Sequence, residues 1–222
     1  MSIFNIFLAL HVAGGGTGLL TGILSLSAQK GGNVHTKSGI VFYFAMLTVA
    51  ATSFLLSVLH PNPFLFAVGV FTGYTTLTGR RYLTQKQKGL ANQTDNFEKI
   101  LVAIMFVFVL VFLYLGMSSL IKQNYFGIVF LVFGWGTFNM VREDYAIIQG
   151  KNTNPMLWLR MHISRMTGAW IAAFTAFIVV NGDKITALLP QNLATITFIL
   201  LWLLPAFIGT PFIIYWLRKM KV

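Results

Sequence analysis

The sequence predicts an all-α fold, a polytopic bundle of transmembrane helices, and three observations lead to it. Hydrophobic residues make up 56% of the 222 residues and charged residues only 9%, against roughly 25% in an ordinary soluble domain. The mean hydropathy is +0.75. Apolar runs of about 20 residues, the length that crosses a bilayer, recur along the whole chain. A surface with so few charges cannot face water, so we expect one transmembrane domain over residues 1–222.

Seven apolar runs are long enough to span, and short segments rich in Gly, Pro, Asn and Lys separate them. They cover approximately 3–28, 37–60, 63–83, 98–121, 124–148, 157–181 and 192–218. The first run lacks a basic start and is long enough to cross, so it is interpreted as a helix rather than a cleaved signal peptide. Only the separator from Thr84 to Lys99 has room for structure outside the membrane.

The basic residues predict the orientation of these helices. With the N-terminus outside and the C-terminus in the cytoplasm, fourteen of the sixteen Lys and Arg residues fall on the cytoplasmic side. The outer side keeps only Lys122 and Lys184. This asymmetry is what the positive-inside rule predicts. The net charge of +11 therefore indicates anionic lipid headgroups as partners rather than nucleic acid.

Glycines interrupt the first run, "LHVAGGGTGLLTGILSL". Gly14, Gly18 and Gly22 follow one another at four-residue spacing, and His11 and Ser25 share their face. Small residues at this spacing let helix backbones approach closely in lipid. The pattern predicts an interior packing helix, and direct contact of a substrate with the exposed backbone is the functional alternative.

The fourth and seventh runs have other features. The fourth, "ILVAIMFVFVLVFLYLG", is apolar on every face and predicts a lipid-facing helix. The seventh contains Pro205 and Pro211, each of which leaves a backbone carbonyl without its helical partner. We therefore expect a kink in the seventh helix.

Charged side chains collect where the third and fifth runs end and the sixth begins. They come from "TGRRYL", "FNMVREDYAII" and "LWLRMHISRMTGAW". Cations outnumber acids, which would suit an anionic ligand such as a carboxylate or a phosphate. Structural salt bridges and snorkelling arginines are the alternative explanation. The predicted ligand-binding residues are Arg80, Arg142, Glu143, Asp144, His162 and Arg165.

The four histidines raise the possibility of haem ligation. His11 and His60 are expected near the outer side, and His35 and His162 near the inner side. His35 and His60 lie about 37 Å apart along one helix, too far for closely stacked haems but compatible with one. His11 has a simpler interpretation as a neutral histidine that is hydrogen-bonded across helices. No catalytic residue and no cofactor are predicted by the leading interpretation, and haem b is the alternative.

Several specific functions are excluded. Without cysteine there is no thiolate nucleophile, zinc–thiolate site or iron–sulfur cluster. The last run has no lysine that could form a retinal Schiff base. The H-x-x-x-H pair typical of membrane zinc hydrolases is also absent from the sequence. No G-K-[ST] follows "GGGTG", and no serine stands in a nucleophile elbow.

The segment "KGGNVHTKSGIVFYFAMLTVAATSFLLS" resembles a group of uncharacterised bacterial multi-spanning membrane proteins. Lys30, Gly31, His35 and Gly39 carry the resemblance, and "GRRYL" at 79–83 is weakly similar. It covers the first three helices and implies a bacterial membrane protein with no known activity.

The sequence thus predicts a multi-pass protein of the bacterial inner (plasma) membrane that binds or transports a small anionic or amphiphilic ligand at an inward-facing basic site. Two alternatives stay open at this point. One is a haem-b-type or quinone-linked redox protein, with His11 and His60, or His35 and His162, as iron ligands. The other is a non-catalytic subunit or assembly factor of a membrane complex.

Overall fold

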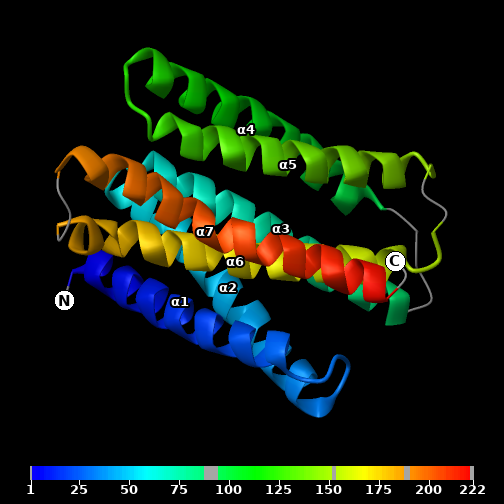
Figure 1. Ribbon diagram of the computed structural model, residues 1–222. Helices are drawn as coiled ribbons and strands as arrows, with labels where there is room; N and C mark the ends of the chain where they lie inside the picture. The colour runs from blue at the N-terminus through cyan, green and yellow to red at the C-terminus, as the bar shows by residue number, and fades with distance from the viewer. Residues whose placement is uncertain (1, 88–94, 152–153, 188–190, 221–222) are drawn as a thin grey trace.

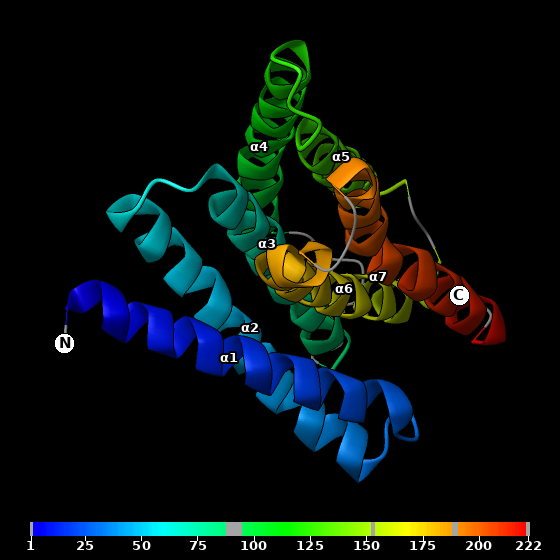
Figure 2. The same cartoon turned by 60° about the vertical axis from the view of Figure 1, so that its left-hand side comes forward.

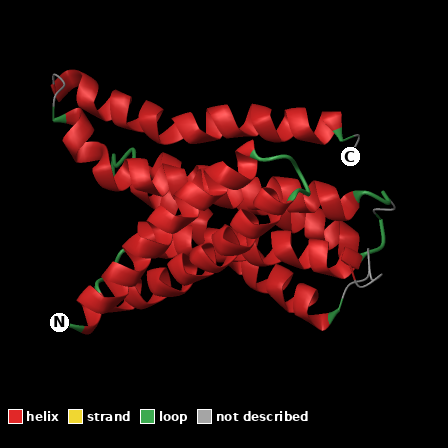
Figure 3. Ribbon diagram, turned by 90° about the horizontal axis from the view of Figure 1, so that it is seen from below, coloured by secondary structure: helices red, strands yellow, loops and turns green. Residues whose placement is uncertain are grey.

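The computed structural model describes residues 2–87, 95–151, 154–187 and 191–220. All regular elements in these ranges are α-helices (Figure 3). In chain order they are Ile3–Ser27 (α1), Asn33–Leu59 (α2), Pro63–Gln87 (α3), Asn96–Ile121 (α4), Gly127–Ile148 (α5), Leu157–Thr186 (α6) and Gln191–Lys219 (α7). The predicted all-α class is therefore confirmed.

Five of the helices are long and apolar enough to cross a membrane. They are α1, α2 and α4 over their full lengths, Leu157–Gly182 of α6 and Leu200–Lys219 of α7. By length and composition the chain is a multi-pass membrane protein. The other two helices, α3 and α5, do not meet this requirement, and α5 carries Arg142, Glu143 and Asp144 in its last turns.

The helices form two outer hairpins around a central group (Figures 1 and 2). The hairpin of α1 and α2 lies on one side, and that of α4 and α5 lies on the other. Between them, α3 packs against α2 and α6, and α6 packs against α7. The two chain ends lie at opposite ends of this assembly (Figure 1).

Local sequence signals fix several helix ends. Gly31 has a φ of 78° in the turn before α2, a conformation that suits glycine. Asp95 caps α4 in a capping box with Glu98, and Arg81 of α3 pairs with both carboxylates. Hydrogen bonding with Glu98, followed by that with Arg81, lowers the pKa of Asp95 to about 2. The cap therefore stays ionised throughout the neutral range.

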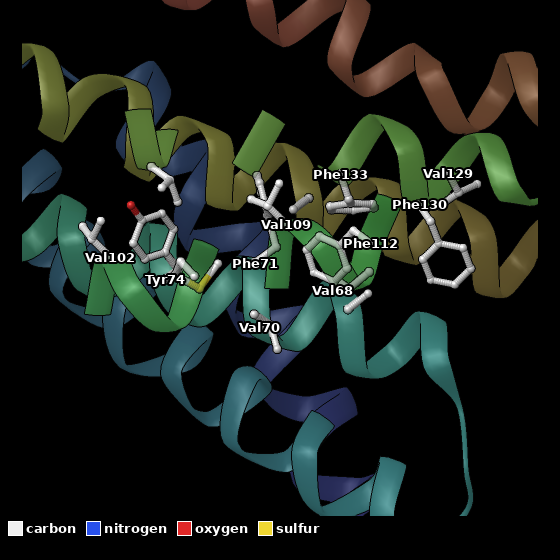
Figure 4. Packing of buried hydrophobic residues seen from close by; sticks show 14 of the residues in the cluster. Val68, Val70, Phe71, Tyr74, Val102, Val109, Phe112, Val129, Phe130 and Phe133 are labelled. Carbon is white, nitrogen blue, oxygen red and sulfur yellow. The ribbon is translucent and has the colours of Figure 1, made fainter. Parts of the chain in front are cut away.

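Aromatic side chains join the α4–α5 hairpin to the central helices. Phe71 of α3 meets Phe133 of α5 edge-to-face, with ring centroids 5.1 Å apart. Phe112 of α4 is fully buried beside them (Figure 4). Because few backbone segments of α3 approach the hairpin closely, these large side chains fill the space between the helices.

The expectation that the first helix lies in the interior is wrong. In α1 only Gly18 and Gly22 are buried, while large apolar side chains along the helix are exposed. The glycines do allow close packing, but on one side only. A Cβ on Gly18 would meet Met46 of α2, and a Cβ on Gly22 would overlap Trp170 of α6.

Two further expectations concern α4, predicted to face lipid, and α7, predicted to be kinked. One face of α4 packs against its neighbours through Val102, Met105 and Val109, while its opposite face is exposed. Helix α4 is therefore peripheral, although it is not exposed on every side. Helix α7 continues through both Pro205 and Pro211.

Replacing Gly22 by Ala should destabilise the protein by about 1–3 kcal/mol, because the added methyl overpacks a tight contact. The Trp170 indole cannot move away freely, since its Nε1 donates to the Leu19 carbonyl oxygen at 3.2 Å. Gly16→Ala is the matched control, since no atom lies within 4 Å of that Cβ position. Equilibrium unfolding by SDS in mixed micelles measures both variants. Equal stability of the two would contradict the packing of α1 on α6.

Candidate functional site

Asp144 of α5 is the centre of a buried polar network. It is only 4% exposed. Its Oδ1 accepts hydrogen bonds from Arg165 Nη2 of α6 at 2.9 Å and from the Tyr82 hydroxyl of α3 at 3.0 Å. The Tyr74 hydroxyl of α3 donates to Oδ2. One carboxylate thus connects three helices, and both of its oxygens are hydrogen-bonded.

Helix periodicity explains how α3 supplies both tyrosines. Tyr74 and Tyr82 are eight residues apart, a little over two turns, so they project from nearly the same side of the helix. Both are buried. Their hydroxyls reach the carboxylate from two different turns, which fixes its orientation.

Arg165 is fully buried, an unusual position for a charged side chain. Besides Asp144, its Nη2 donates to the Met140 carbonyl oxygen at 3.1 Å and lies 3.8 Å from Glu143 Oε2. Its guanidinium carbon lies 5.2 Å from the centre of the Tyr74 ring. Gly79 makes this position accessible, because a Cβ there would stand 3.0 Å from the Arg165 Cβ.

The charges in this network balance. Arg160, at the surface end of α6, pairs with Glu143 at 3.1 Å, while Arg165 pairs with Asp144. Two arginines therefore face two carboxylates. The surplus of positive charge that the sequence predicted at this site is absent from the network itself.

Several buried polar atoms have no hydrogen-bond partner in the part of the chain that the structure describes. Arg165 Nε and Nη1 are among them, and together these nitrogens carry three of the five N–H donors of a guanidinium. The hydroxyls of three buried threonines on α3 and α5 share this property: Thr72, Thr76 and Thr137. An unpartnered buried donor is costly, so this combination indicates a place for acceptor atoms.

A small cavity reaches Asp144. Its volume is about 10 Å³, the room of a single water molecule. Its polar lining contains Asp144, Thr78, Tyr82, Gln85, Arg81 and Glu98. Thr78, Tyr82 and Gln85 bring α3 to this cavity, and Asp144 and Ile148 bring α5 to it.

The structure brings together only part of the predicted site. Glu143, Asp144 and Arg165 meet as one group. Arg142 is exposed and joins no ion pair among the described residues. Arg80 is half-buried next to Gly79, outside the network. The tyrosines and Arg160 were missed, although the eight-residue spacing of Tyr74 and Tyr82 was a usable signal.

His162 lies in a second group, opposite His35. Their ring centroids are 6.4 Å apart. His162 Nδ1 is 3.1 Å from the Gly79 carbonyl oxygen, and His35 Nδ1 is 3.0 Å from the Ser25 carbonyl oxygen.

His11 and His60 do not form such a pair. His11 Nδ1 is hydrogen-bonded to the Thr52 hydroxyl of α2 at 3.1 Å, as expected for a histidine bonded across helices. His60 is exposed and packs against Phe4. Thr52 and His60 are eight residues apart, about 12 Å along α2. One iron therefore cannot be shared by His11 and His60 in this arrangement.

Comparisons with protein-family models, with curated proteins and with solved structures find no match to this chain. Within residues 2–87, 95–151, 154–187 and 191–220, no group of three or more His, Cys, Asp or Glu side chains could hold a metal ion. The function is therefore argued from the geometry of these two groups alone.

Replacing Asp144 by Ala should lower the free energy of unfolding by about 3–5 kcal/mol, because it leaves the Arg165 charge buried without its counter-ion. Glu143→Gln is the control, since Glu143 is partly exposed and its loss should cost less than about 1 kcal/mol. SDS unfolding in mixed micelles compares the two. If both variants were equally stable, Asp144 would not be the centre of the network.

Proposed function

We propose that this chain is a seven-span protein of the inner (plasma) membrane, with its N-terminus outside, that binds or transports a small anionic ligand together with one proton. The five strongly apolar helices, the chain ends at opposite ends of the assembly and the basic residues on one side support this topology. A carboxylate is the ligand class that fits best, since it matches the planar donors of an arginine.

The main support for this proposal is the Arg165 guanidinium, whose hydrogen-bond donors are not all satisfied. A buried arginine in a membrane protein is a functional candidate by default. Here Nη2 makes the hydrogen bonds of the guanidinium, while Nε and Nη1 have no partner among the described residues. Oxygen atoms of a ligand would accept from these nitrogens, and the nearby threonine hydroxyls would complete its hydrogen bonds.

The charge balance of the network couples the binding of an anion to the uptake of a proton. An added anion would give the buried network a net negative charge, which is unfavourable in a medium of low dielectric constant. The balance is restored if Asp144 takes up one proton as the ligand replaces it as the counter-ion of Arg165. The cavity beside Asp144 would give that proton a route towards Glu98.

We assign the ligand a route along threonines of α3 and α5. Thr76 and Thr72 lie one and two turns before Gly79 on the same face of α3, and Thr137 precedes Met140 on α5. Their hydroxyls are buried and have no hydrogen-bond partner among the described residues. Together with the cavity at Asp144, they are the buried polar groups along which a ligand and a proton would reach the ion pair.

The test is acetate binding to the purified protein in detergent, measured by isothermal titration calorimetry. Two buffers with different heats of ionisation are compared, because the difference in binding heat gives the number of protons taken up. We expect one proton to be taken up per acetate, and up to a tenfold tightening per unit decrease in pH where proton uptake limits binding. Asp144→Asn should remove the proton uptake.

The control variants separate the site from general effects on the fold. Thr137→Val removes an unpartnered hydroxyl and should weaken acetate binding several-fold. Thr75→Val should leave binding unchanged, because the Thr75 hydroxyl already donates to the Phe71 carbonyl oxygen at 2.8 Å. The proposal fails if acetate, formate and phosphate give no binding at millimolar concentrations, or if they bind without proton uptake.

A further inference from the structure

Four helices surround the histidine pair. Close packing occurs between α1 and α2, α2 and α3, α3 and α6, and α1 and α6. These contacts close a ring in which α2 and α6 stand opposite each other. His35 comes from α2 and His162 from α6, so the two imidazoles face each other across the inside of a four-helix bundle.

Each imidazole is held by one of the two remaining helices. His35 Nδ1 lies 3.0 Å from the Ser25 carbonyl oxygen and 3.1 Å from the Ser25 hydroxyl of α1, and His162 Nδ1 lies 3.1 Å from the Gly79 carbonyl oxygen of α3. A carbonyl oxygen can only accept, so we assign the proton of each ring to Nδ1. This leaves the Nε2 lone pair of each ring as its free ligand atom. Metal-bound histidines are oriented in the same way by a hydrogen bond from their other nitrogen.

The separation of the rings matches two ligands of one metal. A metal–imidazole bond is about 2.0 Å, so two rings on opposite sides of one metal have centroids roughly 6 Å apart. The observed 6.4 Å agrees with this value.

The surrounding charges select the kind of metal centre. Lys30 Nζ donates to the Ser25 carbonyl oxygen at 3.2 Å, the same oxygen that holds His35. Arg80 directly follows Gly79, which holds His162. Among the described residues neither cation is paired with a carboxylate, because the ion pairs there are those of Arg81, Arg160 and Arg165. A bare dication would be repelled here, whereas a group with its own carboxylates would be stabilised.

Apolar side chains continue the bundle interior beyond the histidines. Phe42 and Met46 of α2 pack with Ala169 of α6, and Met166 and Trp170 lie against them. They stand one to three turns from the histidines along the same two helices. This surrounding suits an apolar macrocycle whose charged edge faces Lys30 and Arg80.

We propose that His35 and His162 are the two axial ligands of one b-type haem, with its propionates towards Lys30 and Arg80. This site is distinct from the Arg165 network and goes beyond the proposed function. Two imidazoles are an established ligand set for haem iron in proteins, and a single haem fits the single histidine pair.

The test is the visible spectrum of the full-length protein, purified in mild detergent from cells supplied with iron and 5-aminolaevulinate. We expect a Soret band, sharpened bands on reduction with dithionite, and close to one haem per chain by the pyridine haemochrome assay. A colourless protein overturns the proposal. Bound metal without a Soret band, measured by elemental analysis, overturns it as well.

Variants assign the ligands. His35→Ala and His162→Ala should each lower haem content at least tenfold, whereas His60→Ala should retain it, because His60 is exposed at the far end of α2. His35→Gly with added imidazole distinguishes loss of the ligand from misfolding. A folded variant should regain the Soret band when free imidazole binds in place of the missing side chain. Haem retained by the His35→Ala/His162→Ala double variant would refute the assignment.

Discussion

The ion pair between Asp144 and Arg165 is the interaction on which the arrangement of this protein depends. It connects α5 to α6, and the two tyrosine hydroxyls bring α3 to the same carboxylate. The α4–α5 hairpin otherwise meets the central helices mainly through large aromatic side chains. In a membrane interior a charged side chain is tolerated only with a partner, so this pair fixes the position and the register of the hairpin.

Gly79 links the two polar groups of the protein. Its carbonyl oxygen holds His162, and its lack of a side chain lets Arg165 lie against α3. His162 and Arg165 are three residues apart on α6, so they occupy neighbouring turns. The charge-balanced network and the histidine pair thus share one crossing of α3 and α6. Both candidate sites of the described chain meet at this crossing.

Much of the fold followed from the sequence because hydrophobic length is a strong signal in membrane proteins. Seven helices were expected, and their bounds differ from the predicted ones by a few residues. Helix α2, for example, begins at Asn33 rather than at about residue 37. The glycines of α1 were correctly interpreted as contact points. Their spacing does not reveal whether a helix has neighbours on one side or on all sides, so α1 was wrongly placed in the interior.

The candidate site was predictable only in part. Charged residues near helix ends drew attention to Asp144, Glu143 and Arg165, but sequence spacing could not distinguish the buried Asp144 from the exposed Arg142 two residues away. The partnership of Tyr74 and Tyr82 with Asp144 depends on how α3 is rotated against α5, which tertiary packing decides. The opposition of His35 and His162 likewise depends on the ring of four helices. Both histidines were named beforehand, but which pairing would form was left open.

The central claim is that an anion enters the Arg165 site as Asp144 takes up a proton. The most direct measurement is the infrared difference spectrum of the protein with and without ¹³C-labelled acetate, which separates ligand bands from protein bands. The account predicts a new carboxylic acid C=O band on binding, lost in Asp144→Asn. Bound acetate with every carboxylate still ionised would contradict it.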